Sequence, residues 1–527
     1  MSNDGVTRAA TVGGAPNGAP PAIELRGISK SFGPVKANQD VSLTIAPGTI
    51  HGIIGENGAG KSTLMSILYG FYEADSGEIL VNGAVKRITS SSDAIAAGIG
   101  MVHQHFMLVE PFTVLENVIL GAEGGALLAG GKAKARAELQ RLEREYTLEV
   151  PVDAVVGDLP VGLQQRVEIL KALYRGADTL ILDEPTGVLT PQEADHLFRI
   201  LAALRAQGKT VILITHKLRE IMAITDAVTV MRQGRVVANV ATRETSREQL
   251  AEMMVGRKVL LRVDKTPARP GETLLEVRDL DVVDGQGVRR VKDVSLTLRA
   301  GEIVGIAGVS GNGQSELLAA IAGMVKPAKG DIVVGGKALS SLPRVDARTL
   351  RSLGVGHVPE DRHRDGLVTA FSAAECSILG HHDDPAFNGA VLTDGRKVVE
   401  NCGQLMRDYD VRPPNPHLKA ANFSGGNQQK IIVGREVERD PKVLLVGQPT
   451  RGVDIGAIEA IHRRLVALRD SGKAILLVSV ELDEIRSLAD RILVMFDGMI
   501  VGEVAAEGAS EQSLGLMMAG VQQEAAE

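Results

Sequence analysis

The stretch GENGAGKST, residues 55–63, decides the fold of the first half of this chain. It fits the pattern G-x-x-x-x-G-K-[ST] and lies between an apolar, strand-like segment, TIHGIIG (49–55), and a helix-like segment, KSTLMSILYG (61–70). Glycines let such a loop wrap closely around an anion, with backbone N–H groups aimed at phosphate oxygens beside a helix N-terminus. The stretch therefore predicts a phosphate-binding loop within an α/β fold, rather than a purely structural glycine turn.

The side chains of this loop predict a nucleotide site that uses Mg²⁺. Lys61 is expected to reach the β- and γ-phosphates of ATP, and the Ser62 hydroxyl is expected to ligate Mg²⁺. Phe32 is expected to stack on the adenine. The expected nucleotide contacts extend along the whole loop, through Gly55, Glu56, Asn57, Gly58, Ala59, Gly60, Lys61, Ser62 and Thr63.

An acidic pair follows a second apolar segment, TLILDEP (179–185). Asp183 suits the Mg²⁺ site, and Glu184 suits the role of general base for the attacking water. An isolated Asp-Glu pair usually belongs to a solvated loop, so this interpretation depends on the phosphate-binding loop that precedes it.

Two more polar residues follow strand-like segments. His216 comes directly after TVILIT (210–215), which would bring it near the γ-phosphate, and Gln104 follows GIGMVH (98–103). Gln104 is expected to contact the metal and the attacking water. A lone histidine after a strand is more often structural, so its catalytic interpretation also depends on the neighbouring motifs.

The chain carries the same order of motifs twice. GVSGNGQS (308–315) repeats the first glycine loop, PTR at 449–451 repeats PTG at 185–187, and VMFDG (494–498) repeats VMRQG (230–234). The spacing is constant over the last third of each half, which predicts two homologous domains with a short insertion in the second.

Composition and periodicity divide the chain into four parts. A tail biased toward Gly, Ala, Pro and Asn is expected over 1–21, a first domain over 22–257, a linker rich in charge, Pro and Gly over 258–272, and a second domain over 273–520. Within each domain, alternating strand-like and helical segments predict a mainly parallel sheet with helices on both faces, interrupted by a smaller helical insert.

These motifs together resemble an ABC transporter ATPase over nearly the whole chain after residue 22. The match includes the glycine loop, Gln104, the acidic pair, His216 and, in the second half, the signature NFSGGNQQ (422–429). The resemblance implies an α/β fold of two tandem P-loop NTPase domains of the ABC type, each with a mainly parallel sheet core, an antiparallel β portion and a helical subdomain. It also implies that Ser424, Gly425 and Gly426 face the γ-phosphate of a nucleotide held by the opposite domain.

The second half has lost the groups that hydrolysis requires, and VVDGQG (282–287) offers no counterpart to Phe32. The replaced positions are Lys61 by Gln314, Asp183 by Gly447, Glu184 by Gln448, His216 by Val480 and Gln104 by Glu360. Five changes at chemical positions in one domain predict that its own nucleotide site no longer hydrolyses ATP.

The first half has a complementary defect in its signature, which reads DLPVGLQQ (158–165). Pro160 lacks an amide donor and Val161 crowds the loop with a branched side chain. Because ABC domains pair head to tail, the intact loop at 55–63 would meet the intact signature at 424–426, and the two defective motifs would meet each other. We therefore expect the two halves to pair and to form one competent and one degenerate composite ATP site.

Transport would need further subunits, because apolar runs such as VILIT (211–215) are far shorter than the roughly 20 residues that span a bilayer. The resemblance implies two transmembrane permease subunits, whose coupling helices enter grooves near Gln104 and Glu360. It also implies an extracytoplasmic solute-binding lipoprotein or periplasmic protein that acts through the permease. The expected location is peripheral, at the cytoplasmic face of the cell inner membrane.

The expected solute is a nucleoside. Fused halves carrying PEDRHRDGL (359–367) resemble bacterial importers of simple sugars and nucleosides, and LLVGQPTRGVD (444–454) resembles the ATPase of nucleoside importers that use a lipoprotein-type binding protein. Pentose and hexose importers usually keep an acidic pair where this chain has Gly447 and Gln448. A simple-sugar importer remains the alternative.

A tandem ABC protein that acts on the ribosome is a further alternative, but such proteins keep two competent sites and a long charged linker. The net charge of −7, with acids and bases interspersed, argues against a nucleic-acid partner. The two cysteines, Cys376 and Cys402, are too few for a disulfide framework and are expected to be buried thiols.

Overall fold

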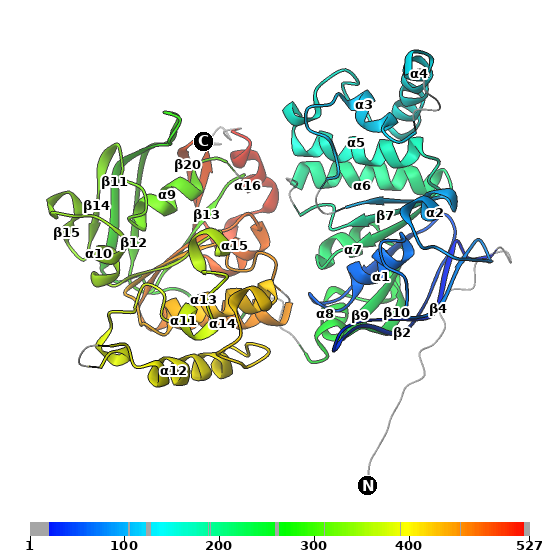
Figure 1. The fold of residues 1–527 in the computed structure, drawn as a ribbon. Coiled ribbons are helices and arrows are strands. Elements are labelled where there is room, and N and C mark those ends of the chain that lie inside the picture. The colour runs from blue at the N-terminus through cyan, green and yellow to red at the C-terminus, as the bar shows by residue number, and fades with distance from the viewer. Residues whose placement is uncertain are drawn as a thin grey trace, which may run out of the picture. The chain divides into compact units, whose positions relative to one another are not determined.

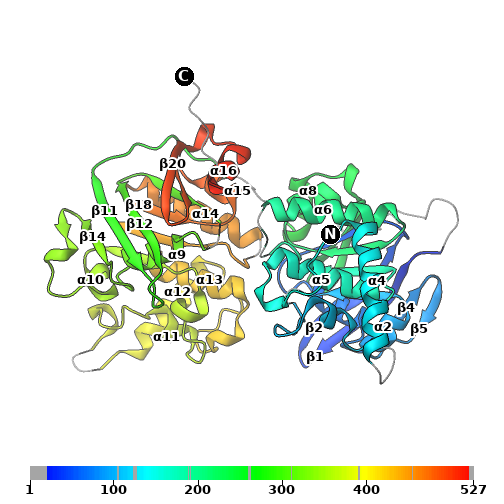
Figure 2. The same cartoon turned by 90° about the horizontal axis from the view of Figure 1, so that it is seen from above.

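The computed structural model describes residues 20–103, 106–122, 128–187, 189, 191–258, 263–309, 311–389, 392–453 and 455–520. The chain divides into two compact units, Met1–Val259 and Leu260–Glu527 (Figures 1 and 2). Most of the tail expected over 1–21, and Gln104, lie outside the described residues.

The core of the first unit is a six-stranded sheet with the order β10-β9-β3-β8-β7-β6. Its strands are β3 (Ile50–Ile54), β6 (Ile99–Val102), β7 (Thr179–Asp183), β8 (Thr210–Ile214), β9 (Ala227–Arg232) and β10 (Arg235–Ala241). All neighbours pair in parallel except β9 and β10. Every residue of β3, β7 and β8 is buried, as expected for central parallel strands that are covered on both faces.

An antiparallel sheet and a helical part complete this unit. The sheet has the order β2-β1-β4-β5, formed by β1 (Ile23–Phe32), β2 (Val35–Ile45), β4 (Ser76–Val81) and β5 (Ala84–Lys86). The helices are α1 (Lys61–Leu68), α2 (Ser91–Ala96), α3 (Val114–Ile119), α4 (Leu128–Tyr146), α5 (Val161–Tyr174), α6 (Pro191–Ala206), α7 (Leu218–Ile224) and α8 (Arg247–Val255). Figure 1 shows α3 and α4 at one end of the unit and strand β2 at the other, beside β9 and β10 of the core sheet.

The second unit repeats this architecture. Its core sheet, β16-β17-β18-β13-β19-β20, consists of β13 (Ile303–Ala307), β16 (Val355–Val358), β17 (Val443–Gly447), β18 (Ala474–Val478), β19 (Arg491–Phe496) and β20 (Met499–Ala505). Its antiparallel sheet, β12-β11-β14-β15, consists of β11 (Thr273–Val283), β12 (Arg289–Arg299), β14 (Lys329–Val334) and β15 (Lys337–Ala338). The expected fold of two tandem domains, each with a mainly parallel core, an antiparallel portion and a helical part, is confirmed.

The helices of the second unit show where its helical insert lies. They are α9 (Gln314–Ile321), α10 (Ala347–Ser352), α11 (Ala373–Ser377), α12 (Gly395–Asp408), α13 (Gly425–Val437), α14 (Ile455–Asp470), α15 (Leu482–Leu488) and α16 (Glu511–Met518). Helices α11, α12 and α13 contact one another and enclose both cysteines, Cys376 and Cys402, which are buried and free as expected. Among the described residues, no helix is both long and apolar enough to cross a membrane.

Candidate nucleotide site

Three adjacent strands of the first core sheet bring the predicted site residues to one edge. The glycine loop follows β3, Asp183 ends β7, and His216 follows β8 by one residue. Because β3 pairs with β8 and β8 pairs with β7, all in parallel, the carboxyl ends of these strands lie side by side. In open parallel sheets this edge is where ligands bind.

Two glycines of the loop are required by close packing. A Cβ on Gly55 would overlap the Met231 carbonyl oxygen, and a Cβ on Gly60 would overlap the Ala37 carbonyl oxygen. Gly60 also has a left-handed backbone, with φ 96°, directly before helix α1. The loop therefore passes against β2 and β9 and leaves its other side to the N-terminus of α1, whose first N–H groups have no partner within the helix.

Lys61 heads α1 but lies inside the loop. Its side chain is 6% exposed, and Nζ donates hydrogen bonds to the carbonyl oxygens of Gly55 (2.7 Å) and Glu56 (3.0 Å). Burial lowers the pKa of Lys61, although the carboxylates of Glu184, Asp183 and Glu56 oppose that shift. The ammonium group is therefore held at the centre of the loop by weak carbonyl acceptors, which an anion can replace.

The remaining loop residues surround this ammonium group. Asn57 and Ser62 are exposed, Thr63 is half-buried, and Ala59 is buried with its N–H bonded to the Glu56 carbonyl oxygen. Asn57 and Ser62 are thus the loop's exposed polar side chains among these four residues.

Asp183 and Ser62 form the pair expected for the metal. Asp183 is buried, which raises its pKa, while a hydrogen bond with the Ser62 side chain lowers it in part. A buried carboxylate next to a hydroxyl offers two hard oxygen ligands, and Mg²⁺ commonly binds through one or two protein oxygens together with phosphate oxygens and water. The residues therefore fit a Mg²⁺ site at this position.

Glu184 and His216 are in direct contact. His216 Nδ1 donates to Glu184 Oε1 at 2.8 Å, and both side chains are largely but not fully buried. Burial favours a higher pKa for Glu184, but the hydrogen bond and charge of His216, followed by Lys61, outweigh it and lower the pKa. Glu184 is thus an ionised acceptor, held in one orientation by the histidine.

Phe32 lies away from these groups, at the end of β1. It is 42% exposed and packs edge to face against Tyr72, with ring centroids 5.1 Å apart. Tyr72 is also exposed, so the two rings offer a larger aromatic surface than Phe32 alone. Tyr72 had no motif around it, and nothing in the sequence pointed to it.

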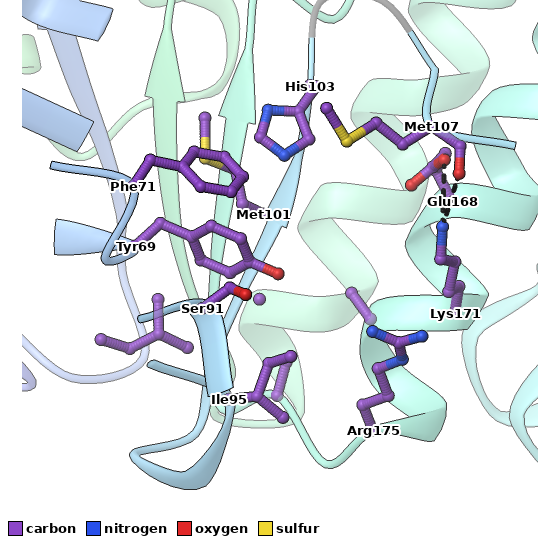
Figure 3. A pocket seen from close by; sticks show the side chains of 14 residues that line it. Tyr69, Phe71, Ser91, Ile95, Met101, His103, Met107, Glu168, Lys171 and Arg175 are labelled. Atoms are coloured by element: carbon purple, nitrogen blue, oxygen red, sulfur yellow. Dashed lines mark hydrogen bonds and ion pairs between the residues drawn. The ribbon is translucent and has the colours of Figure 1, made fainter. Parts of the chain in front are cut away.

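Gln104 lies outside the described residues, but its neighbours border a cavity of about 210 Å³. Figure 3 shows Tyr69, Phe71 and His103 on one side of this cavity, with Lys171 of helix α5 and Arg175, which directly follows that helix, on the other. Lys171 donates to the Met107 carbonyl oxygen at 2.8 Å, which joins α5 to the segment that follows Gln104. The cavity therefore lies between the core sheet and the helical part of the first unit.

A further pair near the site was missed by the sequence analysis. Thr186, two residues after Glu184, donates a hydrogen bond to Glu220 of helix α7, and both residues are buried. Burial raises the pKa of Glu220. The internal repeat could have indicated this pair, because the second half has the same two residue types, Thr450 and Glu484, at the equivalent positions. The pair fixes the loop after Glu184 to the helix after His216.

The second unit keeps the shape of the site without its charges. Gln314 is 5% exposed and donates to the Val309 carbonyl oxygen at 3.2 Å, much as Lys61 donates within its own loop. Ser315 donates to the Glu360 carboxylate instead of meeting an aspartate, and Gly447 has no room for a side chain beside Glu360. Gln448 accepts a hydrogen bond from the Val480 N–H at 3.2 Å. At the positions of Lys61 and Glu184, the second unit therefore has the neutral side chains of Gln314 and Gln448.

One strained backbone position persists in both units. Glu184 has φ 47° and Gln448 has φ 46°, a left-handed conformation that is uncommon outside glycine, asparagine and aspartate. The second unit therefore retains this backbone conformation although a glutamine replaces the glutamate.

The two signatures differ at the cap of the helix that they begin. Ser424 caps α13 without using its hydroxyl on the helix, and that hydroxyl accepts a hydrogen bond from Asn427 Nδ2 at 2.8 Å. In the first unit, Pro160 takes the capping position of α5 and Val161 follows it, 40% exposed. Only the second unit presents a hydroxyl and two glycine amides at this helix end.

Comparisons with known proteins agree with these features. The sequence profile of the family described as "ABC transporter" matches residues 38–187 and 291–451. The chain is 47% identical to the nucleoside import ATP-binding protein NupA of Lactococcus lactis, over 94% of this chain and 98% of that protein. It is 46% identical to the guanosine import ATP-binding protein NupO of Bacillus subtilis (96% and 98% covered) and 45% identical to the glucose import ATP-binding protein TsgD13 of Haloferax volcanii (95% and 96%).

Proposed function

The chain belongs to the ABC transporter family, and from that membership we propose that it is the ATPase subunit of an importer with one competent composite ATP site. One observation carries the proposal. Lys61, Asp183 and Glu184, with His216, converge at one sheet edge of the first unit, whereas each counterpart in the second unit is neutral. Such a constellation suits phosphoryl transfer to water.

The roles of these side chains follow from their contacts. Lys61 exchanges its two carbonyl acceptors for oxygens of the β- and γ-phosphates and balances their charge. Glu184, ionised and oriented by His216, accepts the proton of the attacking water. Phe32 stacks on the adenine, and Gln104 contacts the metal and the water.

Ser62 and Asp183 hold Mg²⁺ in this proposal, together with Gln104. The bound ion would neutralise charge on the phosphates and polarise them for attack. Because Asp183 is already hydrogen-bonded to Ser62, the two oxygens are close enough to share one small cation.

The signature at 424–426 completes the site from the second half. Ser424 leaves its helix uncapped by a side chain, so the hydroxyl and the first amides of α13 remain available to an anion. In the first half's signature, Pro160 has neither a hydroxyl nor an N–H, and the branched side chain of Val161 crowds the loop. The competent site therefore joins the first glycine loop to the second signature, and the degenerate site joins the other two.

Matched substitutions at the two caps test this pairing. Ser424→Arg should cripple ATP hydrolysis by at least tenfold, because a bulky guanidinium would occupy the γ-phosphate position. Pro160→Arg, at the equivalent cap of α5, should retain most of the hydrolysis. Steady-state phosphate release by the two purified variants decides the matter, and equal losses would count against the head-to-tail assignment.

The importer would need two transmembrane permease subunits and a solute-binding lipoprotein or periplasmic protein that acts through them. The cavity between Tyr69 and Lys171, next to Gln104, is where we place a permease coupling segment. Its aromatic wall suits an apolar side chain. We place the protein peripherally at the cytoplasmic face of the inner membrane, held by these permeases and without a nucleic-acid partner.

We propose a nucleoside as the solute, with a simple sugar as the alternative. Two relatives at 47% and 46% identity are named for nucleoside or guanosine import, and one at 45% is named for glucose import. Uptake of labelled nucleosides and pentoses should be compared in cells with and without this chain. Loss of nucleoside uptake alone is expected, and loss of sugar uptake alone would favour the alternative.

A further inference from the structure

The segment PEDRHRDGL (359–367) has no part in the function proposed above, yet it forms a defined structure. It follows β16 and makes one turn of π-helix over Arg362–Gly366. The Asp361 carboxylate accepts hydrogen bonds from the backbone N–H groups of His363 (2.9 Å) and Arg364 (3.1 Å), and the Leu367 N–H bonds back to the Arg362 carbonyl oxygen. The turn is therefore built to hold its side chains in place.

This turn is fastened along the signature helix α13. His363 Nε2 donates to Gln428 Oε1 at 2.9 Å, and Arg435 Nη1 donates to the Gly366 carbonyl oxygen at 2.9 Å. A Cβ on Gly366 would lie 2.7 Å from Ile432 Cδ1, so the backbone itself packs on the helix. The turn and the helix consequently move as one body.

Arg362 lies at the end of this contact, against the signature. A Cβ on Gly425 would lie 2.5 Å from Arg362 Nη2 and 2.9 Å from Cζ, so the guanidinium occupies the space that a side chain at 425 would need. Arg362 Nη1 also donates to the Arg451 carbonyl oxygen at 3.0 Å. One guanidinium thus packs against the first turn of α13 and donates a hydrogen bond to the loop that follows β17.

The charge of Arg362 is only partly compensated by its neighbours. Burial lowers its pKa, nearby Arg451 lowers it further, and Asp361 opposes the shift. Its Nε is buried and has no hydrogen-bond partner among the described residues. Two cations beside a helix N-terminus create a positive potential that favours an anion in front of the signature.

The first half lacks this arrangement, and its signature is also defective. Residues 105–112, HFMLVEPF, contain no arginine, and Gly187 stands where the second half has Arg451. Val161 takes the place of Gly425, which is possible where no guanidinium needs the space. Arg362, Gly425 and Ser424 thus occur together in the second half, and the first half lacks all three at the equivalent positions.

We propose that Arg362 is a positioning residue of the competent ATP site, which locks Gly425 to the loop at 451 so that the signature stays aligned for the γ-phosphate. The proposal rests on the head-to-tail site described above. A charge-assisted hydrogen bond contributes about 1.5–3 kcal/mol, so its loss should lower kcat/KM for ATP roughly 10- to 100-fold.

The experiment uses the full chain with Arg362→Ala, Arg362→Lys, Gly425→Ala and the double variant Arg362→Ala/Gly425→Ala. Arg364→Ala is the matched control, because Arg364 belongs to the same turn and its side chain is 81% exposed. We expect Arg362→Ala to lower kcat/KM, Arg362→Lys to recover part of it, and Arg364→Ala to match the wild type. ADP affinity should stay unchanged, since ADP has no γ-phosphate for the signature to meet.

The double variant separates positioning from mere packing. Gly425→Ala keeps the amide but displaces the guanidinium, so it should resemble Arg362→Ala and add little in the double variant. Additive losses, or equal effects of Arg362→Ala and Arg364→Ala, would overturn the proposal. The proposal would also be overturned if Arg362→Lys had a lower Tm and this loss of stability accounted for its loss of activity.

Lys61→Ala separates this inference from the function on which it rests. If Lys61→Ala abolishes hydrolysis while Arg362→Ala leaves it intact, only the role of Arg362 is wrong. If Lys61→Ala leaves hydrolysis intact, the proposed site itself is wrong.

Discussion

Glu184 and Asp183 are adjacent in sequence but have opposite electrostatic environments. Burial dominates at Asp183 and raises its pKa, whereas at Glu184 the hydrogen bond from His216 outweighs burial and lowers the pKa. Two neighbouring carboxylates whose pKa values are shifted in opposite directions suit two different roles, one toward a metal and one toward a proton.

At the residue scale, this difference predicts the effect of His216→Ala. Removal of the histidine leaves burial as the main influence, so the pKa of Glu184 should rise. Hydrolysis should fall about 10- to 100-fold, and the acid limb of the pH–rate profile should move to higher pH. Steady-state rates between pH 5 and 9 measure both effects. An unchanged acid limb would mean that His216 does not set the charge of Glu184.

At the element scale, strand β3 contains a buried histidine that its counterpart β13 does not. His51 Nε2 bonds to Thr229 Oγ1 at 2.7 Å, and Thr229 in turn donates to Asn239, so the imidazole is the donor. Burial lowers the pKa of His51 to about 4. At the same place β13 has Val304, which is fully buried.

His51 should make the first unit sensitive to acid. The unfolded chain binds a proton near pH 6.5 and the folded chain only near pH 4, so the free energy of unfolding falls as pH drops through this range. The loss is about 2 kcal/mol at pH 5.

His51→Val, copied from β13, should remove most of this pH dependence. Thermal unfolding at pH 7.5 and pH 5 measures it as the shift in Tm of the first unit. If Tm falls by the same amount between pH 7.5 and pH 5 in the wild type and in the variant, His51 is not the acid-sensitive group.

The sequence predicted the elements that carry the site better than it predicted the contacts between them. Uniform apolar runs marked β3, β7 and β8, and the polar residues directly after them marked the site. The docking of the turn at Arg362 on α13 could not be predicted, because it joins residues about 60 positions apart through tertiary packing. In the second half's predicted helical insert, the described residues between 361 and 420 form α11, α12 and short turns, since Gly and Pro interrupt the periodicity.

At the scale of the whole molecule, the duplicated domains and the motif residues that each has lost form one pattern. In the head-to-tail pairing proposed above, each half supplies one good motif to the competent site and one defective motif to the other. Independent drift would scatter the defects across both composite sites, whereas in that pairing they gather in one. On this proposal, both domains are kept because the loop around Lys61 needs the signature that the second half supplies.

The most direct test of this account compares Lys61→Ala with Gln314→Ala. The two residues are closely matched, since each heads the first helix of its unit, is buried, and donates to a carbonyl of its own loop. Their effects on folding should therefore be similar, and only their chemistry differs. The measurement is steady-state ATP hydrolysis by each purified variant. We expect Lys61→Ala to abolish hydrolysis and Gln314→Ala to retain most of it; equal losses in the two variants would contradict the account.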